Sequence, residues 1–545
     1  RIVMQQISPW KRVQALIQDH KKEVTSIYLF SILGGIVNLS LPLGVQTIIG
    51  LVMGATMVTS IYVLIFLVVL GVFLMGLFQI NQMKIIESIQ QKIFAHYAYD
   101  FAQKLPSLDL KQMDKYHIPE KVNRFFDTLN IQKGFAKLLL DIPVATVQIV
   151  FGIILLSLYH PLFIILGLIL LLLLGLILFY TSKKGIETSI EESTYKYEVA
   201  GFFGEIARTI KTFKFSQGSD LNLIRTDENV MGYLAARTTH FHVLLFQYKS
   251  LIFFKIALTT LMLTLGSYLL INQQLNVGEF VAAEIVIMLV IGAVEKLITS
   301  LDSAYDVFTG LEKLASVTDS PLETSGELTV DTQEGLEIEM KNFSFEFEPG
   351  KPVLHSINLH INPGEKIQIA GPAGAGKSIL MRVLTGNYID FKGTLLINKV
   401  PIKNYSLASL RKHTGILLQN QEIFKGTVWE NISLGNKDIS PSMILATANE
   451  LGFADFLNHF TKGFDTDIEP LGKKTPQSIV KKILLLRALC GDKRLVLLEN
   501  PWSGLEPELA KRIQAYLVQL KATVLVSTNE NGTFGKKIEI NNGKV

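Results

Sequence analysis

The chain has 545 residues, of which 49% are hydrophobic, and its mean hydropathy is +0.34. It is too long for one ordinary domain and too apolar to be wholly soluble, so we expect part of it to lie in a lipid bilayer. The small net charge of +4 argues against a nucleic-acid partner or a polyacidic substrate, and the single cysteine, Cys490, excludes an internal disulfide and is expected to be a buried thiol.

Residues 1–24 are predicted to form an amphipathic helix at the membrane interface. The segment is polar and carries Trp10, Lys11 and Arg12, side chains that suit the boundary between lipid and water. It lacks the continuous apolar core of a cleavable signal peptide. The chain opens on Arg1 rather than on methionine, which leaves open whether further sequence precedes it.

Six apolar stretches are long enough to cross a bilayer, which takes about 20 residues of helix. Three of the connections between them are short and contain no lysine or arginine, whereas those at 81–137 and 181–250 are long and basic. Because positively charged connections stay in the cytoplasm, we expect these two segments and both termini on that side of the membrane. The predicted spans are 27–52, 58–80, 138–158, 162–180, 251–271 and 280–297.

Both long connections begin and end with helical periodicity that continues a span. We therefore predict helices that extend well past the bilayer, with short docking helices at 108–118 and 209–215. The alternative is an ordinary solvated loop, but loops of this length without secondary structure are uncommon.

Ionisable residues within or near the spans are candidates for a transport path. Lys255 and Glu295 lie near cytoplasmic ends, where long side chains can reach water, so Glu284 is the best candidate. Asp141 is the fourth such residue. Other polar side chains are expected to form hydrogen bonds between helices: Gln148, Thr259, Thr260 and Thr264.

The composition changes after Pro321, where polar segments, turn dipeptides and short β-rich runs replace the apolar stretches. We predict a linker at 323–335 and a soluble domain over 336–545. Its first strands are expected at 336–347, 353–361 and 366–370.

The strand at 366–370 leads directly into a glycine-rich loop and a helix at 379–384. This strand, loop and helix match the P-loop pattern in its required context. The glycines let backbone N–H groups surround phosphates, while Lys377 reaches the β and γ oxygens and Ser378 can ligate Mg²⁺. The loop reads Gly371, Pro372, Ala373, Gly374, Ala375, Gly376, Lys377, Ser378.

The P-loop segment resembles the nucleotide-binding domains of ABC transporters, and the six-span half resembles the exporter type of that family. The resemblance covers nearly the whole chain. It implies an all-α six-helix transmembrane domain at 25–322, followed after the linker by an α/β P-loop domain at 336–545. The family binds ATP with Mg²⁺, and both cofactors are expected here.

Two further segments resemble motifs of the family. Residues 345–347 resemble the loop whose aromatic side chain stacks on adenine, which gives that role to Phe347. Residues 415–419, together with 424–432, resemble the glutamine loop. By this resemblance Gln419 contacts Mg²⁺ or its water and relays the state of the nucleotide to the docking helices.

The later motifs depart from the family pattern. Glu499 stands where the family has the Walker B aspartate and can still hold Mg²⁺ through water, while Asn500 replaces the catalytic glutamate. A neutral amide cannot take a proton from the attacking water. Asn529 stands in the place of the switch histidine.

The signature segment is also altered. The family starts this helix with Ser-Gly-Gly, whose amides contact the γ-phosphate across a dimer, but Pro476 has no N–H and Gln477 adds a side chain where close approach is needed. We expect Thr475 to cap this helix and Pro476 to take its first position. The segment reads Thr475, Pro476, Gln477, Ser478, Ile479.

The resemblance implies two chains for each ATP site, and hence a second half-transporter that is either an identical copy or an intact partner. In an identical pair neither site has a base, so we predict ATP binding with weak or absent hydrolysis. Motifs near 116–134 and 159–161 resemble the type I secretion and peptide-exporter subgroup, whose members act in the bacterial inner membrane with a periplasmic adaptor protein. Membrane lipid is the other expected partner.

Three functions remain open from the sequence. The chain is either an exporter half that moves a substrate, such as a peptide or a protein, or a nucleotide-gated membrane scaffold or regulator that no longer transports. A membrane-tethered P-loop kinase is the third reading, but it leaves the glutamine loop and the long cytoplasmic helices without a purpose.

Overall fold

The computed structural model describes residues 8–54, 58–113, 118–215, 219–419, 421–528 and 534–545. The chain divides into two compact units. The first comprises Arg1–Pro106 and Tyr116–Ser320, and the second comprises Ser107–Lys115 and Pro321–Val545.

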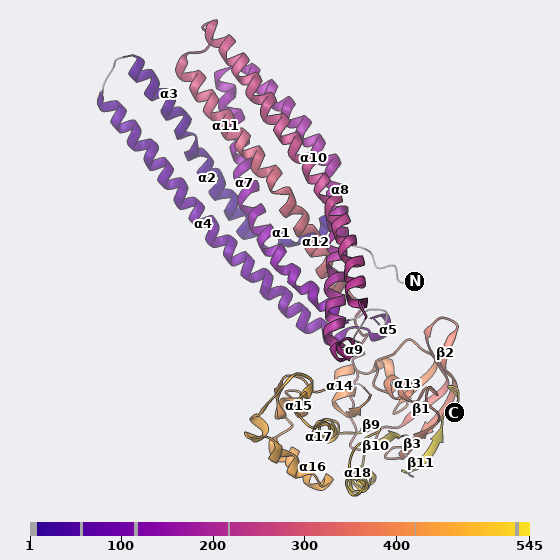
Figure 1. The fold of residues 1–545 in the computed structure, drawn as a ribbon. Coiled ribbons are helices and arrows are strands. Elements are labelled where there is room, and N and C mark those ends of the chain that lie inside the picture. The colour runs from indigo at the N-terminus through magenta and orange to yellow at the C-terminus, as the bar shows by residue number, and fades with distance from the viewer. Residues whose placement is uncertain (1–7, 55–57, 114–117, 216–218, 420, 529–533) are drawn as a thin grey trace. The chain divides into compact units, whose positions relative to one another are not determined.

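The first unit is built from long helices that lie side by side (Figure 1). Six of its described segments are long and apolar enough to cross a membrane, which confirms the six predicted spans. The longest helices, α4, α8 and α10, have 47, 48 and 51 residues, more than twice what a bilayer needs. The helices are α1 (Pro9–Asp19), α2 (Lys21–Asn38), α3 (Ser40–Met53), α4 (Val58–Lys104), α6 (Ile118–Val122), α7 (Asp127–Tyr159), α8 (Pro161–Arg208), α9 (Ile210–Phe215), α10 (Leu221–Ile271), α11 (Val277–Thr299) and α12 (Leu301–Thr318).

The first predicted span, 27–52, is interrupted in the structure. Helix α2 ends at Asn38 and α3 begins at Ser40. Pro42 lies in the first turn of α3 and has no N–H to donate to the carbonyl of Asn38, four residues earlier, so the helical hydrogen-bond ladder is broken there. The sequence pattern of apolar residues does not show this break because both halves are equally apolar.

Small residues allow the membrane helices to approach closely. At Gly35 on α2, an added Cβ would lie 2.2 Å from Cγ1 of Val147 on α7. At Gly134 on α7, an added Cβ would lie 2.7 Å from Cγ2 of Val307 on α12. Such close backbone approach is how helices gain packing energy in lipid, where no hydrophobic effect drives them together.

The second unit contains two main sheets, and with the six spans it confirms the predicted fold class. An antiparallel sheet has the order β2-β1-β4-β5, and a parallel sheet has the order β11-β3-β10-β9-β6. The strands are β1 (Ile338–Glu348), β2 (Lys351–Ile361), β3 (Lys366–Ala370), β4 (Lys392–Ile397), β5 (Val400–Pro401), β6 (Thr414–Leu417), β9 (Leu495–Glu499), β10 (Thr523–Ser527) and β11 (Lys536–Glu539), with a separate small pair, β7 (Gly426–Thr427) and β8 (Asp467–Ile468).

Helices pack against this parallel sheet and bury its central strands completely. All five residues of β9 and all five of β10 are buried, as expected for a parallel sheet that is covered on both faces. Cys490 is fully buried in this core, which confirms the predicted packed thiol. The helices are α13 (Lys377–Leu384), α14 (Leu407–Lys412), α15 (Val428–Ser433), α16 (Pro441–Leu451), α17 (Gln477–Leu489) and α18 (Pro507–Gln519).

The segment Ser107–Lys115 belongs to the second unit although the chain reaches it between two membrane helices. It contains the short helix α5 (Leu110–Met113), which lies within the docking helix predicted at 108–118, of which 114–117 lie outside the described residues. The Lys111 ammonium donates to Oδ2 of Asp390 at 2.8 Å and lies 5.1 Å from the centre of the Phe345 ring. The hydrogen bond and charge of Lys111 lower the pKa of Asp390.

Candidate functional site

The loop between β3 and α13 has the backbone of a phosphate-binding loop. Gly371 has φ +146° and Gly376 has φ +100°, conformations that side chains disfavour. An added Cβ at Gly371 would lie 2.1 Å from the carbonyl oxygen of Ile540. The loop therefore needs glycine at these positions, and its first helical turn starts directly at Lys377 and Ser378.

The side chain of Lys377 lies back along this loop. Its ammonium donates to the carbonyl oxygens of Gly371 at 2.6 Å and Pro372 at 2.9 Å. The residue is buried, with 9% of its surface exposed. The positive charge is thus held within the turn that the glycines form, beside the N–H groups at the start of α13, and this combination attracts a phosphate group.

The parallel sheet brings most of the predicted site residues to one edge. Strand β3 ends at Ala370 before the P-loop, β6 ends shortly before Gln419, and β9 ends at Glu499. Because these strands run parallel in one sheet, with β10 between β3 and β9, their carboxyl ends share an edge, where α/β proteins bind ligands. The backbone N–H of Gln419 donates to Oε2 of Glu499 at 2.5 Å, which joins two residues 80 positions apart.

The carboxylate of Glu499 has one oxygen free for a cation. Oε2 accepts the N–H of Gln419, but Oε1 is buried and has no hydrogen-bond partner among the described residues. A buried carboxylate oxygen without a partner is costly, and Mg²⁺ or a metal-bound water would satisfy it. Mg²⁺ is usually held by one or two carboxylates together with waters and substrate phosphates, so a magnesium site needs few protein ligands. Apart from this arrangement, no cluster of three or more His, Cys, Asp or Glu suited to a metal occurs in the described part of the chain.

Asn500 adopts a left-handed backbone with φ +44°. Its N–H donates to the carbonyl of Ser527 at 2.7 Å, and its own carbonyl accepts the ammonium of Lys481 at 2.7 Å. Asparagine tolerates this conformation better than glutamate does. Backbone contacts and a lysine from α17 thus hold Asn500, the residue predicted to replace the catalytic base of the family.

Lys481 is the residue at this edge that sequence reasoning missed. Burial lowers the pKa of its ammonium, which is nevertheless anchored to a carbonyl oxygen. From the sequence, a lysine in an amphipathic helix is expected to be a solvated side chain. Only the folded structure shows that Lys481 contacts the turn after β9. No feature of the local sequence could have revealed this contact.

The signature segment starts its helix one residue later than predicted. Helix α17 begins at Gln477, and Pro476 is the N-cap without a side-chain hydrogen bond, so the predictions of Thr475 as cap and Pro476 at the first helical position were wrong by one residue. Proline has φ −55° and ψ 140° here, the extended geometry that precedes a helix. Among the described residues, no hydrogen bond or ion pair connects 475–479 with the P-loop of the same chain.

Phe347 lies at the end of β1, half-buried in an aromatic cluster. Its ring centre is 5.0 Å from that of Phe345 and 5.5 Å from that of Tyr388, both edge to face. These contacts fix the ring while leaving part of it exposed for stacking. Asn529, predicted at the switch position, lies outside the described residues.

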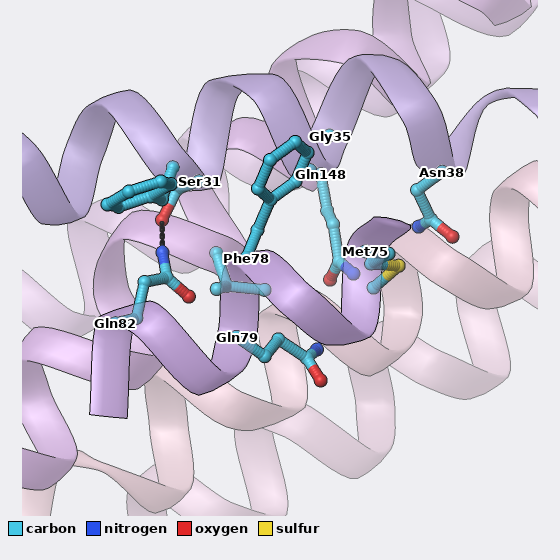
Figure 2. Close-up of a pocket in the computed structure, with 11 residues that line it drawn as sticks. Ser31, Gly35, Asn38, Met75, Phe78, Gln79, Gln82 and Gln148 are labelled. Atoms are coloured by element: carbon cyan, nitrogen blue, oxygen red, sulfur yellow. Dashed lines mark hydrogen bonds between the residues drawn. The ribbon is translucent and has the colours of Figure 1, made fainter. Parts of the chain in front are cut away.

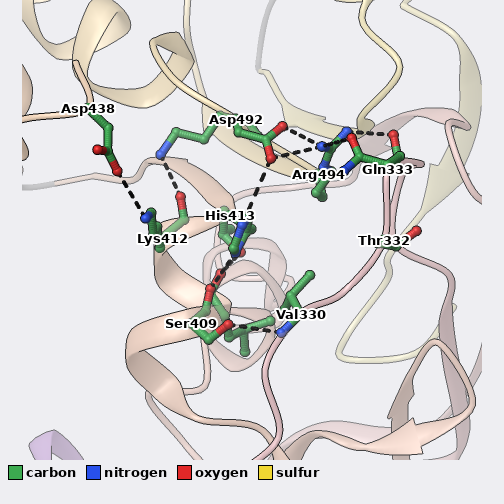
Figure 3. A network of polar contacts seen from close by, with 12 residues as sticks. Val330, Thr332, Gln333, Ser409, Lys412, His413, Asp438, Asp492 and Arg494 are labelled. Carbon is green, nitrogen blue, oxygen red and sulfur yellow. Dashed lines mark hydrogen bonds and ion pairs between the residues drawn. The ribbon is translucent and has the colours of Figure 1, made fainter. Parts of the chain in front are cut away.

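The opposite edge of the parallel sheet carries a polar network with a different purpose (Figure 3). Arg494, directly before β9, forms an ion pair with Asp492 at 2.6 Å and donates to the carbonyl of Gln333 at 2.5 Å. The backbone N–H of Arg494 donates to the carbonyl of His413 at 2.8 Å. These bonds tie the linker to the amino ends of β6 and β9, so we interpret the network as structural.

In the membrane unit, three of the four ionisable candidates have clear positions. The Lys255 ammonium pairs with Glu295 at 2.5 Å, and Asp141 accepts the hydroxyl of Ser300 at 2.9 Å. Glu284 is half-buried on α11. The predicted interhelical hydrogen bonds are missing from the described part of the chain for Gln148, Thr259, Thr260 and Thr264.

Comparison with protein families agrees with this arrangement. The model of the ABC transporter transmembrane region matches residues 24–294, and the ABC transporter model of the nucleotide-binding region matches residues 354–503. Both regions occur once and in this order. The chain belongs to the ABC transporter family, and its one transmembrane region and one nucleotide-binding region make it a half-transporter.

Individual relatives of this half-transporter match parts of its length. The ABC transporter ATP-binding protein YknV of Bacillus subtilis is 26% identical over 48% of this chain and 44% of its own length. The alpha-hemolysin translocation ATP-binding protein HlyB of Escherichia coli is 29% identical over 45% of this chain and 35% of its own. The lipid A-core flippase of Hahella chejuensis is 31% identical over 42% of this chain and 40% of its own. The matched stretches thus span less than half of each relative.

The fold of the half-transporter as a whole has a close structural counterpart. A bacterial Atm1-family ABC exporter with ATP bound superposes with a TM-score of 0.86 over 96% of this chain and 94% of that chain. The two sequences are only 18% identical, so this similarity establishes the fold.

Proposed function

We propose that this half-transporter binds ATP and Mg²⁺ and serves as one half of an exporter that moves a substrate across the bacterial inner membrane, while its own hydrolysis is weak or absent. One observation carries the proposal: the same chain contains a P-loop and six candidate membrane spans. The ammonium of Lys377 lies inside the turn of that P-loop. The transmembrane domain is 25–322 and the nucleotide-binding domain is 336–545, with the latter and both termini in the cytoplasm.

The nucleotide site uses residues from several strands. Lys377 and the loop N–H groups hold the β and γ phosphates, and Ser378 with Glu499 and Gln419 holds Mg²⁺ directly or through water. Mg²⁺ neutralises phosphate charge when it is bound. Phe347 supplies the surface on which the adenine stacks.

Weak hydrolysis follows from the residues at the end of β9. Asn500 carries no group that takes a proton from water near neutral pH, and the loss of a general base costs about 10²–10⁴-fold in rate. Because each ATP site of the family uses two chains, a second half-transporter is required, either an identical copy or an intact partner. An intact partner would supply the base and histidine that this chain lacks at one of the two sites.

The substrate class is part of the proposal. Motifs at 116–134 resemble the peptide and protein exporters, and the name of the relative HlyB refers to the translocation of a protein toxin. Another relative is named for lipid A, so the relatives alone favour neither class. In the exporter subgroup the partner set would include a periplasmic adaptor.

The test measures ATP affinity and ATP turnover of the full chain in nanodiscs, without other subunits. We expect ATP to bind and turnover to stay at background. Lys377→Ala should weaken ATP binding about 10- to 100-fold, because it removes a charge-assisted hydrogen bond to phosphate, whereas the exposed Lys399→Ala should not. Turnover that depends on Lys377 would contradict weak hydrolysis, and absent ATP binding would contradict the whole proposal.

A nucleotide-gated scaffold is the alternative, and the observation that favours it is the replacement of the base by Asn500. Reconstitution with an intact half-transporter separates the two functions. ATP-dependent substrate movement by the pair supports export, and ATP-dependent dimerisation without movement supports the scaffold.

A further inference from the structure

A large cavity lies between α1, α4 and α12 in the membrane unit and encloses about 640 Å³. This volume is within the range of pockets that bind small ligands. The pocket between α2, α4 and α7 in Figure 2 is different, because it encloses only about 20 Å³, room for about one water. There Gln82 donates to the hydroxyl of Ser31 at 2.7 Å and ties α4 to α2. The large cavity is therefore the better candidate for a ligand.

The wall of this cavity combines apolar surface with basic side chains. Leu16, Ile93 and Leu311 line it and are buried. A ligand that has both a charged group and an apolar part fits such a wall better than a purely polar one. The basic residues of the wall are Lys11, Arg12, Lys92 and Lys104, together with His20 and His96.

Three of the four lysine and arginine side chains in the wall are already paired with carboxylates. One pair joins α1 to the end of α12, a second joins α4 to α2, and the third lies within α4. Their charges are therefore largely neutralised, and the pairs hold the wall together. The pairs are Arg12 with Asp319 at 2.7 Å, Lys92 with Glu23 at 2.6 Å and Lys104 with Asp100 at 2.9 Å.

One ammonium, one carboxylate and two imidazoles of the wall have no such partner. Among the described residues, none forms a hydrogen bond or an ion pair with these four side chains. The ammonium and the carboxylate cancel each other's charge, and each imidazole adds a positive charge when it is protonated. These free groups therefore suit a ligand with one negative charge, whereas a nucleoside triphosphate carries too many. The four residues are Lys11, Asp19, His20 and His96.

The cavity lies at the level where the first membrane helix leaves the bilayer. His20 directly precedes α2, which begins the first candidate span. The ammonium of Lys92 on α4 pairs with Glu23, four residues before the predicted start of the hydrocarbon span at Ile27, which is about 6 Å along a helix. The headgroup layer is about 5–8 Å thick on each side of the hydrocarbon core. Phospholipid headgroups are thus within reach of the cavity.

We propose that this cavity binds the phosphodiester headgroup of an anionic phospholipid. Lys11, His20 and His96 contact the phosphate, and the apolar part of the wall contacts the glycerol and the start of the acyl chains. A phosphodiester carries one negative charge, which matches the free groups, and basic pockets between membrane helices bind such headgroups in other membrane proteins. A soluble phosphodiester has the same chemistry, so the experiment includes one. The site is separate from the nucleotide site and goes beyond the proposed function.

Binding is coupled to the protonation of His20. Burial is the main cause that lowers the pKa of His20 below its usual value of 6.5. In the empty cavity the ring is therefore neutral at pH 8 and gains a proton only in acid. A bound phosphate favours the protonated ring, so the affinity for a ligand of constant charge should rise about 3- to 10-fold from pH 8 to pH 6. The other ionisable groups around the cavity are Lys11, Arg12 and Asp19 on α1, Glu23 on α2, Lys92, His96, Tyr97, Asp100 and Lys104 on α4, and Glu312 and Asp319 on α12 and its C-cap.

The test uses the full chain in phosphatidylcholine nanodiscs and three probes. These are dihexanoyl phosphatidylglycerol, its headgroup glycerophosphoglycerol without acyl chains, and the zwitterionic dihexanoyl phosphatidylcholine. Calorimetry measures binding after the heat of empty nanodiscs is subtracted, and we expect saturable binding of phosphatidylglycerol alone. Equal binding of glycerophosphoglycerol would assign the site to a soluble phosphodiester, and equal binding of phosphatidylcholine would exclude the anionic class. Either result, or no saturable binding, overturns the proposal.

Two exchanges change the free charges in opposite directions. Lys11→Gln should weaken the binding of phosphatidylglycerol about fivefold, the effect of one basic residue near a lipid surface. Asp19→Asn should strengthen it by a similar factor, because it removes the free carboxylate. Lys22→Gln, at an exposed lysine of α2 outside the cavity, is the matched control and should leave the affinity unchanged. Weaker binding in Asp19→Asn would mean that the carboxylate holds an ammonium group of the ligand, and would overturn the anionic class.

The remaining variants test the space and the imidazole. Ala15→Phe keeps every charge but narrows the cavity and should abolish saturable binding, whereas Ala235→Phe at an exposed position of α10 should not. His20→Gln should remove the rise in affinity between pH 8 and pH 6, and His242→Gln at an exposed position of α10 should keep it. Unchanged affinity in both Lys11→Gln and Ala15→Phe would overturn the cavity as the site. A pH dependence that survives in His20→Gln would overturn the coupling to this ring.

Discussion

The two ends of the proposed nucleotide site lie on one edge of one sheet but have changed to very different extents. The P-loop end keeps its glycines and Lys377 in the expected geometry. At the β9 and α17 end, Glu499 and Asn500 depart from the family pattern. The carboxylate of Glu499 accepts the backbone N–H of Gln419, and the backbone N–H of Asn500 donates to the carbonyl of Ser527. The comparison teaches that backbone groups of Gln419, Asn500 and Ser527 hold this edge together, so that the side chains at the end of β9 can differ from the family pattern without loss of the fold.

The largest expected effect comes from restoring the replaced end. We expect a chain with five exchanges, which are given below, to hydrolyse ATP about 10²–10⁴-fold faster than the normal chain. The exchanges restore a general base and the signature amides without a change in the strands that position them. Phosphate release by the purified chain measures it. The same chain with Lys377→Ala should be inactive. The exchanges are Asn500→Glu, Pro476→Ser, Gln477→Gly, Ser478→Gly and Asn529→His.

If turnover of the restored chain stays at background, the replaced residues at the β9 and α17 end do not explain the weak hydrolysis. The cause of inactivity would then lie outside the replaced residues, for instance in the membrane unit.

A smaller effect is expected at Glu499, the last residue of β9. Glu499→Gln removes the negative charge from the buried carboxylate, one oxygen of which has no hydrogen-bond partner among the described residues. We expect the affinity for Mg²⁺ in the presence of ATP to fall about 10- to 100-fold. Titration of Mg²⁺ at fixed ATP measures this change. Glu506→Gln, at the exposed N-cap of α18, serves as control. Equal Mg²⁺ dependence in Glu499→Gln and the normal chain would exclude Glu499 from the metal site.

The third prediction concerns stability. Asn500→Glu alone should lower the free energy of unfolding by about 1–2 kcal/mol, because glutamate tolerates the left-handed backbone poorly. Thermal unfolding followed by the fluorescence of Trp429 and Trp502 measures it. Asn500→Gly should cause no such loss, and Asn449→Glu on the exposed face of α16 is the control. A loss in Asn500→Gly as large as in Asn500→Glu would contradict backbone strain as the cause.

The smallest effect depends on pH. Burial raises the pKa of Cys490, at the end of α17, from 9.0 to about 11. Below pH 9 the thiol is protonated in both states. Above it the unfolded chain ionises first and binds fewer protons, so stability falls as pH rises, by about 1 kcal/mol at pH 9.5. Comparison of Cys490→Ala with the normal chain at pH 8 and 9.5 measures this slope, and an equal slope in both would contradict it.

Much of the fold follows from the sequence because its signals are local. Apolar length predicts the six spans, and a strand followed by glycines and a lysine predicts β3, the P-loop and α13. The break at Leu39 was not predicted, since a proline in an apolar run signals a kink only when the hydrogen bonds around it are known. The start of α17 was misplaced by one residue because Thr475 and Pro476 both suit a helix N-terminus.

The site was predictable only where a motif is continuous in the chain. Lys377 and Ser378 follow from one eight-residue pattern, whereas the contact of Lys481 with Asn500 joins positions that no pattern connects. Gln148 in the membrane unit is a similar case. Gln148 was taken for a contact between helices, and only the arrangement of α2, α4 and α7 reveals that it shares a space with Asn38 and Gln79.

The segment Ser107–Lys115 has a consequence for the order of events during synthesis. Lys111 leaves the ribosome 279 residues before its partner Asp390, and at 5–20 residues per second the delay is about 15–55 seconds. During this time the flanking membrane helices are already made, while the loop between them has no surface to bind. The nucleotide-binding unit is thus completed by a piece of chain that was made long before it, and a ribosome that stalls before residue 390 would leave that piece without the surface that it binds.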